Sequence, residues 1–169
     1  MLPVLAVATF GLWLLDRPGG GRRWKLAAAS ALGSAGLALI VNRGIAAIWD
    51  RPRPFETHHV GYVYSRSHDP SFPSDHASAS FAIAFAVLFF DRIVGSIFLA
   101  AAILIGAGRI LIGAHYPGDV LAGVLVGLGS AILVVRVARP LLALLVRVVE
   151  RVTDPLLRPL WRLRTRSSA

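Results

Sequence analysis

Five apolar runs follow one another along the chain, separated by short polar segments. Four of them come close to or exceed the roughly 20 residues that a helix needs to cross a bilayer; they are Trp24–Ile48, Ser74–Phe90, Ile93–Ile112 and Pro117–Val135. The first run, Leu2–Leu15, is shorter, which predicts a short span or one visible only in part. It lacks the basic n-region and the cleavage site of a signal peptide. The pattern therefore predicts an all-α, polytopic bundle of about five membrane helices.

Composition favours the same class of protein. The chain of 169 residues is 56% hydrophobic and 16% charged, with a mean hydropathy of +0.66, whereas a soluble domain carries about 25% charged residues. One such run alone would fit a buried helix of a soluble protein, but four or five would leave most of the apolar surface in water. A disordered chain is excluded. The lack of cysteine excludes disulfides, a cysteine zinc site and a thiol nucleophile.

Small residues recur at helical spacing inside the apolar runs, as at Gly123 and Gly127. Glycine at a helix surface lets two helices approach closely in a membrane. We therefore expect the run that holds these two glycines to pack tightly against a neighbouring helix.

The net charge of +9 is concentrated in two segments. Asp16–Lys25, between the first two runs, carries +3, and Arg136–Ala169, after the last run, carries +6. Cytoplasmic segments of membrane proteins are enriched in Lys and Arg, so both segments are predicted to lie on the inner face. Crossing back and forth from there places Asp50–Pro73, Gly113–Tyr116 and the N-terminus on the outer side.

The chain is predicted to divide into a membrane-embedded domain at 1–137 and a basic tail at 138–169. The charged residues of the tail fall on about a third of the helical circumference, and leucine and valine fill the rest. This pattern predicts an interfacial helix on anionic lipid, broken at Pro155 and Pro159. A solvated charged extension is the alternative. Neither aromatic residues nor a motif supports binding of nucleic acid by the tail.

Residues with candidate chemistry form three clusters, all on the predicted outer side. The first is Arg51-Pro52-Arg53-Pro54. The alternating prolines stiffen this segment and prevent it from continuing the helix before it. A guanidinium suits a phosphoryl group because it donates a planar fork of hydrogen bonds. Alone the motif is weak support, because it also fits a basic topology marker.

The second cluster is Pro73-Ser74-Asp75-His76. Ser74 is predicted to cap the helix that follows. The backbone N–H groups of Ser74, Asp75 and His76 would then point outward at the positive end of the helix dipole, where an anion is favoured. His76 in the first turn would meet that anion. The alternative is an ordinary cap with an incidental histidine.

The third cluster places Arg109 near the outer end of one span and His115 and Asp119 at the start of the next. His115 and Asp119 are four residues apart, so the carboxylate is expected to accept a proton from one ring nitrogen. That bond would leave the other nitrogen free as a nucleophile. A lone pair of this kind also fits a structural cap, but three clusters on one side favour a functional site.

As a set, the motifs resemble those of the type 2 phosphatidic acid phosphatase superfamily, in the same order. They are Arg51-Pro52, Pro73-Ser74-Asp75-His76 and Arg109-x5-His115-x3-Asp119. With their spans they cover Asn42 to about Val135. The strings Ser-Phe-Pro-Ser-Asp-His, Arg-Pro-Arg-Pro-Phe and His-Tyr-Pro-x-Asp are similar to the branch of bacterial undecaprenyl-diphosphate phosphatases.

The resemblance implies a lipid phosphatase of the bacterial inner membrane with its site on the outer face. His115 would attack the terminal phosphorus and form a phosphohistidine, with Asp119 orienting it. His76 would protonate the leaving oxygen and later activate water. The residues implied to hold the phosphate oxygens, through side chains or backbone, are Arg51, Arg109, Ser74, Asp75 and Arg43. No metal and no cofactor is implied.

The sequence departs from the family pattern at several positions. The family often has a Lys seven residues before the motif Arg, where this chain has Gly44; Arg43 beside it either takes over the phosphate contact or reaches the lipid interface. Gly108 replaces a Ser that often precedes Arg109, and Asp75 stands where Gly is more usual. Many relatives have six spans, of which five are visible here.

The predicted outer loop contains His58, His59 and His68, without the ligand spacing of a metal motif. A role of His58 or His59 in a lid or in holding pyrophosphate competes with that of solvated loop histidines. Three rival functions stay open. They are a phosphatase of phosphatidylglycerol phosphate, phosphatidate or a phosphorylated prenyl lipid; a vanadium haloperoxidase, which would be soluble; and a non-catalytic lipid-phosphate binder.

Overall fold

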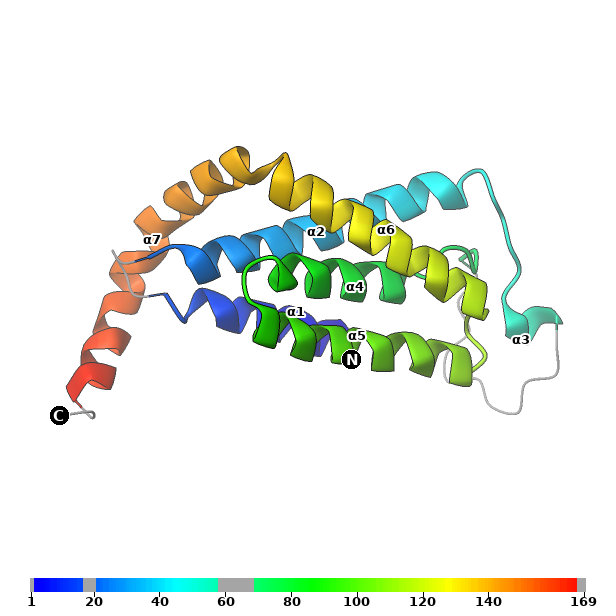
Figure 1. The fold of residues 1–169 in the computed structure, drawn as a ribbon, viewed down its shortest axis with the longest axis horizontal. Helices are drawn as coiled ribbons and strands as arrows, with labels where there is room; N and C mark the ends of the chain where they lie inside the picture. The colour runs from blue at the N-terminus through cyan, green and yellow to red at the C-terminus, as the bar shows by residue number, and fades with distance from the viewer. Residues whose placement is uncertain (1, 17–20, 58–68, 167–169) are drawn as a thin grey trace.

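The computed structural model of the chain describes residues 2–16, 21–57 and 69–166, and for 159–166 only the course of the helix. Every regular element in this part of the chain is a helix. The elements are α1 (Leu2–Trp13), α2 (Arg23–Ala46), α3 (Pro54–Thr57), α4 (Asp75–Leu88), α5 (Arg92–Leu111), α6 (Pro117–Arg136) and α7 (Arg139–Arg166). Figure 1 shows α1, α2, α4, α5 and α6 lying along one axis, with α7 at one end and α3 at the other. The predicted all-α bundle is confirmed.

Three helices in the described part of the chain are long and apolar enough to cross a membrane, namely α2, α5 and α6. The two other bundle helices, α1 and α4, have 12 and 14 residues. At about 1.5 Å per residue, α4 is about 21 Å long, shorter than the roughly 30 Å hydrocarbon core. The helix ends before the predicted run does, because the chain turns at Phe89 and Phe90 and Asp91 caps α5 by accepting bonds from the N–H groups of Ile93 and Val94.

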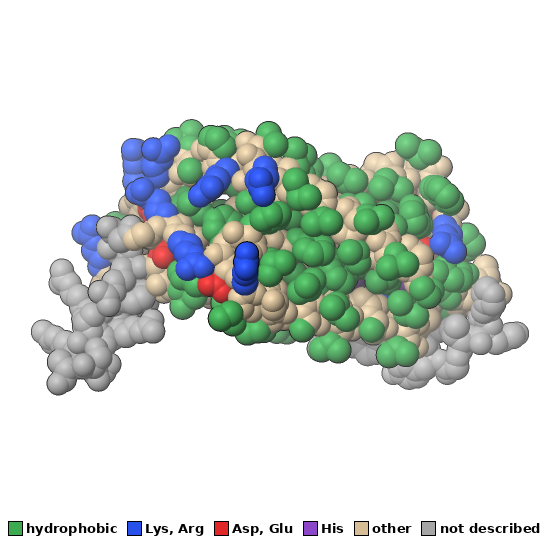
Figure 2. Space-filling model, in the orientation of Figure 1, with side chains coloured by type: hydrophobic (Ala, Val, Ile, Leu, Met, Phe, Trp, Pro, Cys, Tyr) green, Lys and Arg blue, Asp and Glu red, His purple; other side chains and the backbone are tan. Residues whose placement is uncertain are grey.

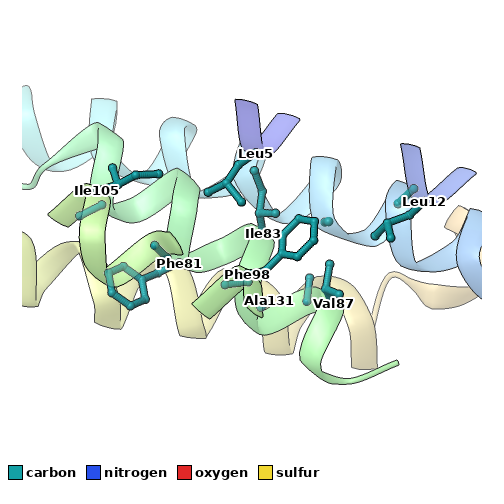
Figure 3. Close-up of a cluster of buried hydrophobic side chains, with 14 of the residues drawn as sticks. Leu5, Leu12, Phe81, Ile83, Val87, Phe98, Ile105 and Ala131 are labelled. Atoms are coloured by element: carbon teal, nitrogen blue, oxygen red, sulfur yellow. The ribbon is translucent and has the colours of Figure 1, made fainter. Parts of the chain in front are cut away.

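The short helix α4 is the centre of the bundle and packs against α2, α5 and α6. Its alanine and serine side chains are almost all buried, which lets the three neighbours come close to its backbone. The larger side chains of α4 form a continuous apolar cluster with residues of α1, α5 and α6; the members labelled in Figure 3 are Leu5, Leu12, Phe81, Ile83, Val87, Phe98, Ile105 and Ala131.

A close helix contact lies between α4 and α6, where Gly123 and Gly127 face α4. A Cβ atom on Gly123 would lie 2.8 Å from the Cβ of Ala77, and one on Gly127 would lie 2.8 Å from the carbonyl oxygen of Ser78. No larger residue fits at either position without moving a helix. The expected close packing at these two glycines is confirmed, and it fixes the start of α6 beside the start of α4.

At the opposite end of the bundle, α7 is held by buried ion pairs. Lys25, at the start of α2, is 1% exposed, and its Nζ lies 3.2 Å from Oε1 of Glu150 and 2.7 Å from Oδ1 of Asp154. Arg22 Nε lies 2.6 Å from the other oxygen of Glu150. The predicted polar stripe therefore turns its acidic residues onto α2. Leucine and valine side chains on the rest of α7 are exposed; they include Leu141, Leu144, Leu145, Val148, Val149, Val152 and Leu156.

The tail forms one helix, so the predicted break at Pro155 and Pro159 is wrong. A proline inside a helix removes one backbone donor and costs about 3 kcal/mol. The ion pair between Lys25 and Asp154 holds the residue just before Pro155 against α2, and this docking offsets part of that cost.

Candidate active site

The three motif segments meet at the end of the bundle that carries α3 (Figure 1). Ser74 caps α4 as predicted, its side chain accepting a bond from the N–H of Ala77, and its own N–H donates to the carbonyl oxygen of Asp119 at 3.1 Å. The N–H of Ser71 donates to the carbonyl oxygen of Arg51 at 2.8 Å. These backbone bonds join residues far apart in the sequence into one site.

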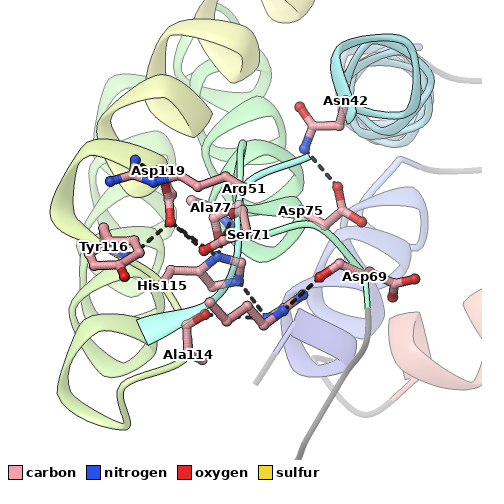
Figure 4. Close-up of polar contacts among 12 residues, drawn as sticks. Asn42, Arg51, Asp69, Ser71, Asp75, Ala77, Ala114, His115, Tyr116 and Asp119 are labelled. Carbon is pink, nitrogen blue, oxygen red and sulfur yellow. Dashed lines mark hydrogen bonds and ion pairs between the residues drawn. The ribbon is translucent and has the colours of Figure 1, made fainter. Parts of the chain in front are cut away.

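His115 lies in the connection between α5 and α6 and is 3% exposed. Its Nδ1 is 2.8 Å from the carbonyl oxygen of Ser71 (Figure 4). A carbonyl oxygen only accepts, so Nδ1 carries the proton and Nε2 keeps its lone pair. Burial, followed by the positive charge of Arg53, lowers the pKa of His115 to about 3, although the bond to Ser71 acts in the opposite direction. Nε2 is therefore an unprotonated nucleophile at neutral pH.

Asp119 is fully buried and holds several donors in place. Oδ2 accepts from the hydroxyl of Ser71 at 2.5 Å and from the N–H of Tyr116 at 2.9 Å, and Oδ1 accepts from Nη1 of Arg51 at 2.8 Å. Oδ2 lies 3.8 Å from Nδ1 of His115, which is too far for a hydrogen bond. The expected direct bond is thus replaced by the bond to the Ser71 carbonyl, which lies closer. Asp119 is linked to the ring through Ser71, whose hydroxyl donates to the carboxylate and whose carbonyl oxygen accepts from Nδ1.

Arg51 is engaged by the residues around Asp119. Besides the bond to that carboxylate, its guanidinium carbon lies 4.2 Å from the centre of the Tyr116 ring. The side chain is 37% exposed. The structure thus brings Arg51 to the edge of the site, where part of its guanidinium faces outward and the rest neutralises Asp119.

Arg53, which was not among the predicted phosphate-binding residues, lies beside Nε2 of His115. It is 7% exposed, and its Nη1 is 3.4 Å from Nε2 of His115 and 3.3 Å from the carbonyl oxygen of Ala114. Its Nε donates to the carbonyl oxygen of Asp69 at 2.9 Å. The first motif contains Arg-Pro twice, so the sequence offered Arg53 as a site residue on the same grounds as Arg51.

Arg109 provides a second cation beside the histidines. Its backbone carbonyl accepts bonds from the N–H groups of Ala114 and His115, which ties the end of α5 to His115. Its charge acts on His115, His76 and Arg53. Within the described residues, its buried Nε has no hydrogen-bond partner. An anion bound beside Arg109 and Arg53 would accept the hydrogen bond that this buried Nε lacks.

His76 is half-buried in the first turn of α4, as predicted, and its neighbour Asp75 faces α2. Oδ1 of Asp75 accepts from Nδ2 of Asn42 at 2.7 Å (Figure 4). Asn42 also exchanges hydrogen bonds with Ser78. Asn42 was missed because it stood out only as a polar residue within an apolar run. The side chain of Asp75 therefore positions the helix start, and only its backbone N–H lies with those of the cap.

Of the remaining predicted residues, Arg43 does not join this cluster. Arg43 is exposed on α2 and makes no hydrogen bond or ion pair within the described residues. His58, His59 and His68 lie outside the residues that the structure describes. Among the described residues, no group of three or more His, Cys, Asp or Glu side chains is placed to hold a metal ion.

Comparison with known proteins agrees with this geometry. Residues 27–142 match the PAP2 superfamily. Undecaprenyl-diphosphatase BcrC of Bacillus subtilis is 37% identical over 73% of this chain and 66% of its own length. The Escherichia coli protein named putative undecaprenyl-diphosphatase YbjG is 33% identical over 76% of this chain and 62% of its own length.

A solved structure has the same fold. The crystal structure of Aquifex aeolicus LpxE superimposes with a TM-score of 0.62 at 24% identity, covering 79% of this chain and 87% of that one. The chain spans somewhat less than two thirds of the length of the curated relatives described above. The match over residues 27–142 contains all three motifs and the helices that carry them. The chain is therefore a multi-pass membrane protein that belongs to the PAP2 superfamily.

Proposed function

We propose that the chain is a lipid phosphatase that hydrolyses the terminal phosphate of a polyprenyl diphosphate through a phosphohistidine. The observation that carries the proposal is the surroundings of His115. Its buried, unprotonated Nε2 is flanked by Arg53, and the Nε of Arg109 nearby has no hydrogen-bond partner among the described residues. This arrangement suits a reaction in which a nucleophile attacks a group that carries several negative oxygens. The names of BcrC and YbjG support the substrate class.

The first step forms a bond between His115 Nε2 and the terminal phosphorus as the phosphorus–oxygen bond to the lipid monophosphate breaks. His76 gives its proton to the leaving oxygen. The ring of His115 becomes cationic, because Nδ1 keeps its proton against the Ser71 carbonyl, and the charge of Asp119 at 3.8 Å stabilises it. Arg53, Arg109 and the backbone N–H groups at the Ser74 cap hold the phosphoryl oxygens.

In the second step, water attacks the phosphohistidine. His76, now neutral, takes a proton from the water, and the phosphorus–nitrogen bond breaks to release inorganic phosphate and free His115. The net reaction adds one water to one diphosphate. The cationic side chains neutralise the substrate, so the proposed reaction needs no metal.

We also propose that the site faces the outside of the plasma membrane and that the tail lies on anionic lipid at the inner face. Figure 2 shows Lys and Arg side chains gathered over the end of the molecule that carries α7, with hydrophobic side chains over the middle. The positive-inside rule places that end in the cytoplasm. The exposed leucines and valines of α7, beside its arginines, suit an interface of acyl chains and anionic head groups.

The activity is tested by phosphate release from undecaprenyl diphosphate in detergent with excess EDTA. The wild type is expected to release phosphate at the same rate with and without EDTA, and the His115→Ala variant is expected to be inactive. Abolition of wild-type release by EDTA would refute the metal-free reaction. Competition with phosphatidylglycerol phosphate and phosphatidate ranks the substrates, and preference for either over the diphosphate would refute the substrate assignment.

The orientation is tested in spheroplasts, where the absence of native cysteine makes single-cysteine labelling clean. A cysteine at Glu56, on the short helix α3, is expected to react with a membrane-impermeant maleimide, and one at exposed Arg151 is expected to react only after lysis. The reverse pattern would place the site in the cytoplasm.

A further inference from the structure

An apolar groove of about 250 Å³ lies between α1 and α5, on the side of the bundle. The wall contributed by α1 includes Leu5 and Ala8, and the wall contributed by α5 includes Ile97, Ala101 and Ile105. Figure 3 shows the inner part of this region, with Leu5 of α1 above the side chains of α4 and α5. All of the lining side chains are apolar. The residues that perform the proposed reaction do not line the groove.

The groove leads toward the candidate site along one face of α5. At about 100° per residue, Ala101, Ile105 and Gly108 share a face, and Arg109 lies beside it. Among the described residues, no heavy atom other than those of the local helix backbone and chain neighbours lies within 4 Å of the position that a Gly108 Cβ would take. Open space at Gly108 thus separates Ile105, at the end of the groove, from Arg109, one helical turn further along α5.

We propose that the groove binds the first isoprenoid units of the lipid whose diphosphate lies at Arg109 and His115. This inference rests on the proposed function and extends it to the tail. The head group and the tail of one lipid must lie end to end, and the groove is the apolar surface that begins one helical turn from Arg109. A bulk acyl chain is the competing occupant, and the experiment below separates the two.

The dimensions set how much of the tail the groove holds. Along α5, at about 1.5 Å per residue, Ile105 is about 6 Å and Ile97 about 18 Å from Arg109. An extended chain advances about 1.2 Å per bond, so an isoprenoid unit of four bonds spans about 5 Å. The first unit thus ends near Ile105, and about four units reach Ile97. The rest of a long tail lies in the bilayer.

The expected loss of affinity for the tail depends on the medium that the tail leaves when it enters the groove. The tail leaves a bilayer that is as apolar as the groove, so binding gains packing contacts without removing apolar surface from water. We therefore expect filling the groove to weaken binding of a multi-unit tail by about tenfold, ~1.4 kcal/mol.

The experiment uses the full chain in phosphatidylcholine vesicles and two diphosphates of different length. The variants Ala101→Trp and Ala8→Trp fill the groove from opposite walls, and Ile103→Trp is the matched control, because Ile103 is 53% exposed on the opposite face of α5. For farnesyl diphosphate, both groove variants are expected to raise KM about tenfold with kcat unchanged, which is the signature of lost uniform binding. For dimethylallyl diphosphate, with one unit, the KM of every variant is expected to match that of the wild type.

Several outcomes would overturn the inference. An unchanged KM for farnesyl diphosphate in both groove variants would mean that the tail lies elsewhere and that bulk lipid fills the groove. An equal rise of KM for both substrates, or for the Ile103→Trp control, would mean that the substitutions act on the site and not on the tail. In these cases the wild type still releases phosphate. A wild type that releases none from either diphosphate would refute the proposed function itself, and this inference with it.

Discussion

Replacing Arg53 with alanine removes the guanidinium that lies 3.4 Å from the attacking nitrogen of His115. Replacing Arg51 with alanine removes a guanidinium that is bonded to Asp119 and partly exposed. Both arginines precede a proline in the same motif, so the pair of variants tests which one serves the reaction. We expect the Arg53→Ala variant to lose much more activity.

The expected loss of kcat in each alanine variant follows from how deeply the arginine is buried and from the contacts that remain once it is removed. A preorganised donor in a buried site contributes about 10²–10³ in kcat, ~2.7–4 kcal/mol, and Arg53 is 7% exposed. Asp119 keeps its bonds to Ser71 and Tyr116 when Arg51 is removed. For Arg51→Ala we therefore expect a loss of only about tenfold in kcat, ~1.4 kcal/mol.

The assay is single-turnover release of phosphate from a polyprenyl diphosphate in detergent, with the thermal unfolding of each variant measured alongside. An Arg53→Lys variant keeps the charge but not the planar fork and is expected to recover part of the lost rate. Equal losses in the two alanine variants, or a larger loss for Arg51→Ala in a folded protein, would refute the assignment of Arg53 to the phosphate.

Three further predictions concern packing, docking and protonation. A Gly127→Ala substitution brings a methyl group to within 2.8 Å of the α4 backbone and is expected to lower stability by about 1–3 kcal/mol. Gly129→Ala, where no described atom lies within 4 Å, should keep or slightly raise the melting temperature; equal melting temperatures of the two variants would contradict the packing. Lys25→Met leaves Glu150 buried without its Lys25 partner and is expected to lower the free energy of unfolding in detergent by about 3–5 kcal/mol. Adding Glu150→Gln to that variant should restore part of this loss, and no restoration would mean that the ion pairs do not dock α7. Diethylpyrocarbonate reacts with neutral imidazole, so the lowered pKa of His115, about 3, predicts a constant rate of its modification between about pH 8 and pH 5. The rate for free N-acetylhistidine should fall below about pH 6.5, and a parallel fall for His115 would show an ordinary pKa.

Much of the fold followed from local features of the sequence. The apolar runs predicted the bundle, Ser74 predicted the start of α4, and the two α6 glycines predicted a close helix contact, because each of these depends on neighbours within one or two helical turns. The predicted run Ser74–Phe90 exceeds α4 by one residue at its start and two at its end, but an apolar run does not show whether protein or lipid surrounds the helix.

The site was predicted as a set of motifs but not in its detailed contacts. Arg51 and Arg53 are equivalent in the sequence, and only the path of the stiff segment around Ser71 decides which one faces His115. The spacing of His115 and Asp119 permitted a direct bond, yet the carbonyl of Ser71, far away in the sequence, takes that place. The continuous helix through Pro155 depends likewise on a partner in α2. Contacts between distant segments are set by packing, which a local pattern does not encode.

The central claim, that His115 is the nucleophile, is tested most directly by finding the phosphate on it. In a His76→Ala variant the first step proceeds with a poor leaving group and the second lacks its base, so rapid quenching in alkali after mixing with a polyprenyl diphosphate is expected to trap the covalent species. Mass spectrometry of the digested protein is predicted to place an acid-labile phosphate on His115 and on no other residue. Phosphate on a different residue, or undiminished turnover by His115→Ala, would contradict the account.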